Sequence, residues 1–168
     1  MRSIQMSGRF VVTGRAARAC LAIAGLGLSF LAAAEEGPGM RAAPLLPKYR
    51  QECASCHIAY PPGALPASSW QRILGNLQHH YGTDASLDPA TVKQLDQWLT
   101  ANAADRSRSI PPPPEDRITR SAWFARTHDE VPTAVWRRPA IKSASNCAAC
   151  HTKADQGDFN EHNVRIPR

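Results

Sequence analysis

Two five-residue stretches decide how this chain folds: Cys53-Ala54-Ser55-Cys56-His57 and Cys147-Ala148-Ala149-Cys150-His151. In each, two residues separate a pair of cysteines, and a histidine follows at once. C-x-x-C-H is the attachment signature of c-type haem. The spacing suits that chemistry, because the two thiols add to the vinyl groups on one edge of the porphyrin and the adjacent imidazole then faces the iron. The sequence therefore predicts two covalently bound haems c. They are attached through Cys53, Cys56, Cys147 and Cys150, with His57 and His151 as proximal iron ligands.

Two other uses of paired cysteines fit less well. A zinc site built from two C-x-x-C motifs usually has about 15 to 20 residues between the pairs, whereas here residues 57–146 separate them. A thioredoxin-like redox motif does not need a histidine directly after its second cysteine. Haem attachment is therefore favoured over zinc binding and over disulfide chemistry.

Residues 1–34 have the features of a secretory signal peptide. They carry four arginines and no acidic residue, followed by an apolar run from Ala19 to Ala34 that ends in small side chains. That run is shorter than the roughly 18 to 20 residues of a membrane-spanning helix. We therefore expect a protein that does not span a membrane once the signal is removed. Covalent haem attachment in bacteria takes place outside the cytoplasm, so we expect a periplasmic location.

The charge is modest once the signal peptide is set aside. Four of the 20 basic residues lie in residues 1–34 and all 14 acidic residues lie beyond them, so the net charge falls from +6 to +2. Such a balance does not favour nucleic-acid binding, which needs a concentrated basic surface. Residues 35–105 have a net charge of −2 and residues 106–168 a net charge of +4. We therefore expect two haems with different reduction potentials.

The second axial ligand of each iron is expected to be histidine. The usual strong partners are Met or a second His. Two of the three Met residues lie in the signal peptide, and Met40 lies in a Gly- and Pro-rich arm at the start of the mature chain. Four His residues remain as distal candidates: His79, His80, His128 and His162.

His80 is the predicted distal ligand in the first half of the chain. Apolar residues with helical spacing predict a helix over 67–81, with one buried stripe that ends at Tyr81. At 100° per residue, His80 lies about 70° from the centre of that stripe, whereas His79 lies almost opposite it. His80 is therefore expected to face a haem and His79 to face water.

His128 is the predicted distal ligand in the second half. If residues around it form one short helix, Phe124 and His128 share a face and provide an aromatic wall for a haem. Asp129 or Glu130 could then accept the other ring N–H. His162, in a polar tail, is the competitor. We expect His57 to pair with His80 and His151 with His128, although the sequence leaves the reverse assignment of the distal residues open.

The chain is expected to be mainly α, with little strand. Asp88-Pro89 is a good helix start, with a capping carboxylate followed by proline. Four consecutive prolines at 111–114 exclude helix and favour an extended linker. We expect a signal peptide (1–34), a class I-like N-terminal haem c domain (35–105) and a loop-rich C-terminal haem c domain (106–168).

The mature chain also resembles the bacterial dihaem cytochrome c family that includes the dihaem cytochrome of purple phototrophic bacteria. The resemblance rests on YRQECASCHIAYPPGALPASSW, LQHHYGTDASLD, ITRSAWFARTHDEVPTAVWRRPAIKSASNCAACH and QGDFNEHNVRIPR. It implies two bis-histidine, low-potential haems, with His80 and His128 as distal ligands. The implied partners are a small oxygen-binding monohaem cytochrome and a membrane b-type cytochrome.

These observations predict an electron-transfer protein and not an enzyme. Two imidazoles per iron would leave coordination little changed between ferric and ferrous states, and the absence of a Met ligand favours low potentials. We expect a monomer. The alternative is a small dihaem enzyme of peroxidase or reductase type, or a gas-binding protein, with one open axial position. Passive haem storage is a third possibility.

Overall fold

The structure is a computed structural model that describes residues 44–104 and 110–168, all within one compact unit. The predicted signal peptide (1–34), Met40 and the predicted domain boundary after residue 105 lie outside the described residues. No helix in the described part of the chain is long and apolar enough to cross a membrane.

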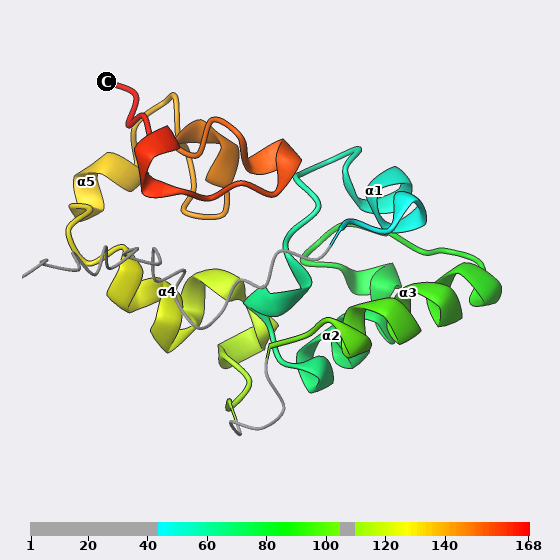
Figure 1. The fold of residues 1–168 in the computed structure, drawn as a ribbon. Coiled ribbons are helices and arrows are strands. Elements are labelled where there is room, and N and C mark those ends of the chain that lie inside the picture. Colours follow the sequence, from blue (N-terminus) through cyan, green and yellow to red (C-terminus); the bar gives the residue numbers. More distant parts are fainter. Residues whose placement is uncertain (1–43, 105–109) are drawn as a thin grey trace, which may run out of the picture. The chain divides into compact units, whose positions relative to one another are not determined.

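The described residues form short helices joined by turns and loops (Figure 1). The α-helices are α1 (Pro47–Cys53), α2 (Ala67–Leu74), α3 (Pro89–Ala101), α4 (Ala122–Thr127) and α5 (Thr133–Trp136). The 3-10 turns are Pro62–Ala64, Leu77–His79, Pro114–Asp116, Ile118–Arg120, Cys147–Ala149, Ala154–Gln156 and Glu161–Asn163. Extended pairing in the same residues is limited to isolated bridges between His80 and Thr83 and between His151 and Val164. The predicted mainly α class with little strand is confirmed.

Helix α3 begins where the sequence predicts. Pro89 occupies its first turn, and the Asp88 carboxylate accepts a hydrogen bond from the Thr91 backbone N–H at 2.9 Å. This cap satisfies one of the donors that a helix start leaves unpaired. Leu95 and Leu99 are buried on the face that α3 turns toward α2, and the two helices lie side by side (Figure 1).

The main apolar core lies in residues 44–104. Trp70 of α2 is buried, and its indole N–H donates to the Pro62 carbonyl at 2.8 Å, so the Pro-rich loop before α2 is fixed to the helix. Burying each large apolar side chain contributes about 1.5 to 3 kcal/mol. The buried cluster consists of Tyr49, Ala59, Leu65, Trp70, Leu74, Leu77, Leu95, Leu99 and Ala103.

The predicted helix over 67–81 is wrong in its second half. Helix α2 ends at Leu74, and Gly75 forms its C-terminal cap. Asn76 then has φ −141°, outside the helical range, and a separate 3-10 turn covers Leu77–His79. Gly carries a helix penalty of about 1 kcal/mol, and Asn next to it adds little support. The chain therefore turns before reaching His80, and Tyr81 is 44% exposed instead of buried.

Residues 110–168 are rich in loops, as expected. The helices in this segment are short. Its buried apolar side chains are few, namely Phe124, Val135, Ile141 and Ala154. A core of this size provides little stability alone. The segment instead makes polar contacts with residues 44–104, of which the shortest is an ion pair between Arg72 and Asp116 at 2.6 Å.

Candidate haem sites

The first C-x-x-C-H motif lies beside one distal candidate. The ring centroids of His57 and His80 are 6.1 Å apart, with an angle of 29° between the ring planes. His57 follows the turn after α1, and His80 follows the 3-10 turn after α2. Residues 23 positions apart are therefore brought together by the loop that joins the two helices.

The second motif lies beside another distal candidate. The ring centroids of His128 and His151 are also 6.1 Å apart, with an angle of 73° between the ring planes. His128 is the C-cap residue directly after α4, and His151 follows the 3-10 turn that contains Cys147. Each proximal histidine thus has a different distal candidate next to it.

The spacing of both pairs can be compared with the distance that one iron between two imidazoles requires. A metal–imidazole bond is about 2.0 Å long. With about 1.2 Å from the ring nitrogen to the ring centre, two trans imidazoles have centroids roughly 6.4 Å apart. The observed 6.1 Å in both pairs is close to that value. Coordination of one iron by two imidazoles would set no fixed angle between the ring planes, so the different angles of the two pairs do not argue against it. The ring spacing of both histidine pairs is therefore compatible with one iron between the two rings.

His57 is held by its own loop. Its Nδ1 atom lies 2.6 Å from the Ile58 carbonyl oxygen, and its ring stacks on Tyr60 with centroids 4.7 Å apart. An N–H donated to a backbone carbonyl fixes the tautomer and leaves the other ring nitrogen for the metal.

His80 is half-buried at the start of a strained turn. The next residue, Tyr81, has φ +50°, which is uncommon for a residue other than glycine, and Gly82 follows with φ +96°. Burial, and secondly the charge of His57, lower the pKa of His80. Both effects favour the neutral imidazole that binds a metal.

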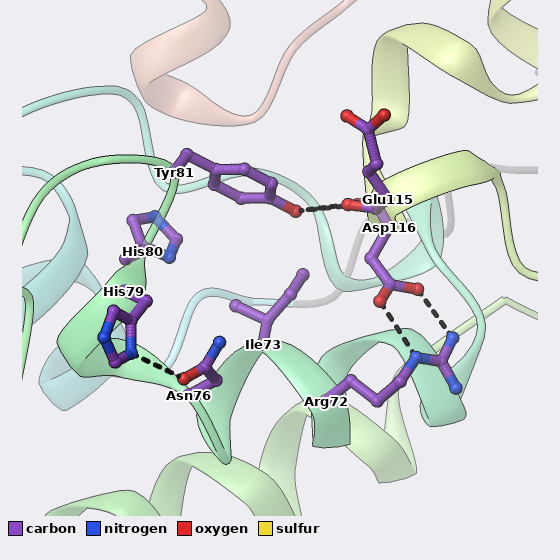
Figure 2. Close-up of a pocket in the computed structure, with 8 residues that line it drawn as sticks. All are labelled: Arg72, Ile73, Asn76, His79, His80, Tyr81, Glu115 and Asp116. Atoms are coloured by element: carbon purple, nitrogen blue, oxygen red, sulfur yellow. Dashed lines mark hydrogen bonds and ion pairs between the residues drawn. The ribbon is translucent and has the colours of Figure 1, made fainter.

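A cavity of about 370 Å³ opens beside His80 (Figure 2). Ile73 lies on its floor and Tyr81 along one side, and the Arg72–Asp116 pair lies opposite His80. The Tyr81 hydroxyl donates to the Glu115 carbonyl at 3.0 Å, so the segment after the prolines is attached to the turn that carries His80. The remaining lining residues are Asn76, His79 and Glu115.

His128 is oriented by the last turn of α4. Its ring stacks on Phe124 with centroids 4.1 Å apart, and its Nδ1 atom lies 3.0 Å from the Phe124 carbonyl oxygen. The predicted aromatic wall is therefore present. The suggested acceptors Asp129 and Glu130 are not the partners of this nitrogen, which instead lies within hydrogen-bond distance of the Phe124 carbonyl oxygen and, at 3.1 Å, of the Thr127 hydroxyl. Trp136 is the second aromatic neighbour, with its ring centroid 5.9 Å from that of His128.

His151 is held by packing. Its ring lies 5.3 Å from that of Phe159, and its backbone forms the isolated bridge to Val164. Its Nδ1 atom is buried and has no hydrogen-bond partner among the described residues. Burial first, and then the charge of His128, lower the pKa of His151, whereas Asp158 opposes this shift. The neutral imidazole is again the favoured form.

The two competing histidines are placed differently. His79 is exposed, and its Nδ1 atom lies 3.1 Å from the Asn76 side-chain oxygen, which agrees with its predicted orientation toward water. His162 is exposed in a short turn, where its backbone N–H donates to Asn160. The structure therefore brings His80 and His128 next to the proximal histidines.

The first cysteine of each motif lies at the end or the start of a helical turn. Cys53 ends α1 and Cys147 begins a 3-10 turn, and both are half-buried. Burial is the main cause that raises the pKa of both thiols, each to about 11. The described residues also contain no group of three or more His, Cys, Asp or Glu side chains arranged to hold a bare metal ion.

Sequence reasoning missed Tyr60 and the polar contacts around Tyr81. Tyr60 is three residues after His57, but no periodic pattern in a Pro-rich loop predicts that its ring stacks on that histidine. The guanidinium of Arg117 lies 4.4 Å from the centroid of the Tyr81 ring, a contact that depends on tertiary structure.

Comparisons with known proteins agree with this geometry. The family profile described as dihaem cytochrome c matches residues 49–159. The diheme cytochrome type c of Shewanella baltica is 39% identical, with a TM-score of 0.64, covering 74% of this chain and 95% of that one. Two structures of the diheme cytochrome c (DHC) of Rhodobacter sphaeroides are 44% and 42% identical, with TM-scores of 0.61 and 0.63. They cover 70% and 71% of this chain and all of the other. No curated protein sequence matches the chain.

The fold and the two motifs thus define a c-type cytochrome with two haems. The chain belongs to the dihaem cytochrome c family, and its cofactors are two c-type haems. Membership of this family implies an electron-transfer haem protein.

Proposed function

We propose that the protein is a low-potential electron carrier with two bis-histidine haems. In the proposal, His57 and His80 ligate one iron, and His151 and His128 ligate the other. The observation that carries it is the 6.1 Å spacing found in both imidazole pairs, each of which contains the histidine of a C-x-x-C-H motif.

The protein side of electron transfer is to hold the iron environment constant. A bound haem supplies a one-electron couple between ferric and ferrous iron. Nδ1 bonds to the carbonyls of Ile58 and Phe124 hold His57 and His128, so their ring nitrogens need no reorientation when the oxidation state changes. A Met ligand would raise the potential, and all three Met residues of the chain lie before residue 44. Histidine ligation on both irons therefore favours low potentials.

The proposed setting is the periplasm, and the proposed role is a shuttle. Cytochromes c are typically exported, and residues 1–34 have the pattern of a cleavable signal. We assign the donor to a membrane b-type cytochrome and the acceptor to a soluble haem protein, such as a small oxygen-binding monohaem cytochrome. The protein would act as a monomer. Mass spectrometry of the exported protein tests the first point, since cleavage after Ala34 predicts a chain that begins at Glu35.

The visible spectrum of the reduced protein, before and after carbon monoxide, tests the proposed ligation. Unchanged bands support two six-coordinate irons and electron transfer. A shifted Soret band would mean that at least one iron is open. That result would refute the double bis-histidine assignment and favour a peroxidase, a reductase or a gas-binding protein.

A further inference from the structure

Tyr60 is fixed from the core of the N-terminal part of the chain. Its carbonyl oxygen accepts a hydrogen bond of 2.9 Å from the hydroxyl of Tyr49, which is only 3% exposed. Tyr49 in turn packs against Trp70 and Trp98, with ring centroids 6.5 and 5.2 Å away. The backbone carbonyl of Tyr60 is therefore anchored to a buried side chain of the core.

The side chain of Tyr60 makes two contacts that belong to different haem sites. Its ring stacks on His57 with centroids 4.7 Å apart and an angle of 23° between the planes. Its hydroxyl donates to the Ser145 carbonyl at 2.9 Å, across 85 positions of sequence. Ser145 stands two residues before Cys147, whose sulfur lies 3.7 Å from the same carbonyl oxygen. One side chain thus joins a proximal histidine to the attachment segment of the other haem.

A second bridge connects the same two regions without touching an imidazole. The Arg50 guanidinium donates to the Asp155 carbonyl at 2.9 Å. Arg50 precedes the first motif by three residues, and Asp155 follows the second motif by four. Arg50 and Tyr60 therefore flank one attachment motif, while Asp155 and Ser145 flank the other.

We propose that Tyr60 is a positioning residue that fixes the plane of the His57 ring and couples it to the segment that carries Cys147. The proposal rests on the proposed function in one respect, because it takes His57 to be an iron ligand. Stacking at 23° leaves the His57 ring little room to turn, and the Nδ1 bond to Ile58 restricts the same rotation. The hydroxyl bond restricts residues 143–147 in the second site.

The ring plane has a spectroscopic consequence that ordinary structural support would not produce. Nearly parallel imidazole planes split two iron d orbitals strongly and give a rhombic low-spin ferric EPR spectrum. Nearly perpendicular planes leave those orbitals almost degenerate and give one large g value. The first pair has an angle of 29° and the second an angle of 73°. The rhombic signal is therefore assigned to the site that contains His57.

Two substitutions at Tyr60 separate the two contacts in the intact holoprotein. Tyr60→Phe removes the hydroxyl and keeps the stacked ring, whereas Tyr60→Leu removes both. We measure hydrogen exchange of residues 143–147 and the ferric EPR spectrum. Loss of one hydrogen bond should speed exchange about fivefold in Tyr60→Phe, with the rhombic signal unchanged. In Tyr60→Leu, exchange should rise at least as much and the rhombic signal should shift.

Two further variants serve as controls. Tyr81→Phe removes the same kind of hydroxyl-to-carbonyl bond at Glu115 and Asp116, and should leave exchange of residues 143–147 at the wild-type rate. Arg50→Ala removes the other bridge, and should speed exchange near Asp155 with no change in EPR.

An unchanged rhombic signal in Tyr60→Leu would overturn the positioning role. Unchanged exchange in Tyr60→Phe would overturn the coupling between the sites. Because Tyr60→Phe keeps the ring, it tests this coupling even if Tyr60→Leu fails to fold. Carbon monoxide binding by the wild-type protein would refute the proposed ligation separately, since the exchange measurement does not depend on it.

Discussion

Replacing one distal histidine should open one iron and leave the other closed. Of the four distal candidates, His80 is the one whose ring lies next to His57, and His128 is the one whose ring lies next to His151. In His80→Ala, one of the two haems in each molecule should therefore bind carbon monoxide. In His128→Ala the other haem should bind it, and in the double variant both haems should.

The expected binding at one full haem in His80→Ala depends on whether His79 can replace the lost ligand. His79 is the adjacent imidazole, but it is exposed and bound to Asn76, and it lies in the 3-10 turn that precedes His80. Moving it into the vacated position would require that turn to unwind. We therefore expect no replacement ligand in His80→Ala.

The assay is titration of the reduced protein with carbon monoxide, followed in the Soret band and normalised to total haem. His79→Ala is the matched control and should bind none, like the wild type. The ferric EPR spectrum provides a second readout, because His80→Ala should lose the rhombic low-spin signal and keep the signal with one large g value. Carbon monoxide binding at both irons in His80→Ala would refute the independent pairing, and binding in His79→Ala would show that the wrong histidine was chosen.

Three other predictions concern the rest of the molecule. Asp88→Ala removes the N-terminal cap of α3 and should lower the unfolding free energy by about 1 kcal/mol, seen as a melting temperature roughly 3 to 5 °C lower; an unchanged melting temperature would contradict the role of the cap. The hydrogen bond from Arg72 is the main cause that lowers the pKa of Asp116 in the folded protein. The ionised carboxylate therefore stabilises the fold fully at pH values above its unfolded pKa of about 3.9. That stability is lost as the pH falls through the lower pKa of the folded state. Asp116→Asn should therefore flatten the acid side of a plot of unfolding free energy against pH, whereas a curve parallel to that of the wild type would speak against the pair. The wild-type ferric protein should give two low-spin EPR signals of equal intensity, as the two ring angles require, and a single kind of signal would be inconsistent with those angles.

Several features of the fold follow from local sequence. Asp88-Pro89 starts α3 because a carboxylate and a fixed φ act within one turn, and no distant contact is needed. The apolar pattern of residues 67–77 likewise predicts that Trp70, Leu74 and Leu77 enter the core. The same pattern continues to Tyr81, yet the helix does not, because Gly75 and Asn76 interrupt the backbone while the apolar spacing stays intact.

The sequence by itself determined the class of the protein and its cofactors. C-x-x-C-H places two thiols and an imidazole within five residues, so the attachment chemistry depends on covalent spacing alone. Only the tertiary structure decided which distal histidine lies beside which motif, because that requires loops to close over 23 residues in both pairs. It also decided the contacts of Tyr60, since stacking and hydrogen bonding across 85 positions have no signature in local periodicity.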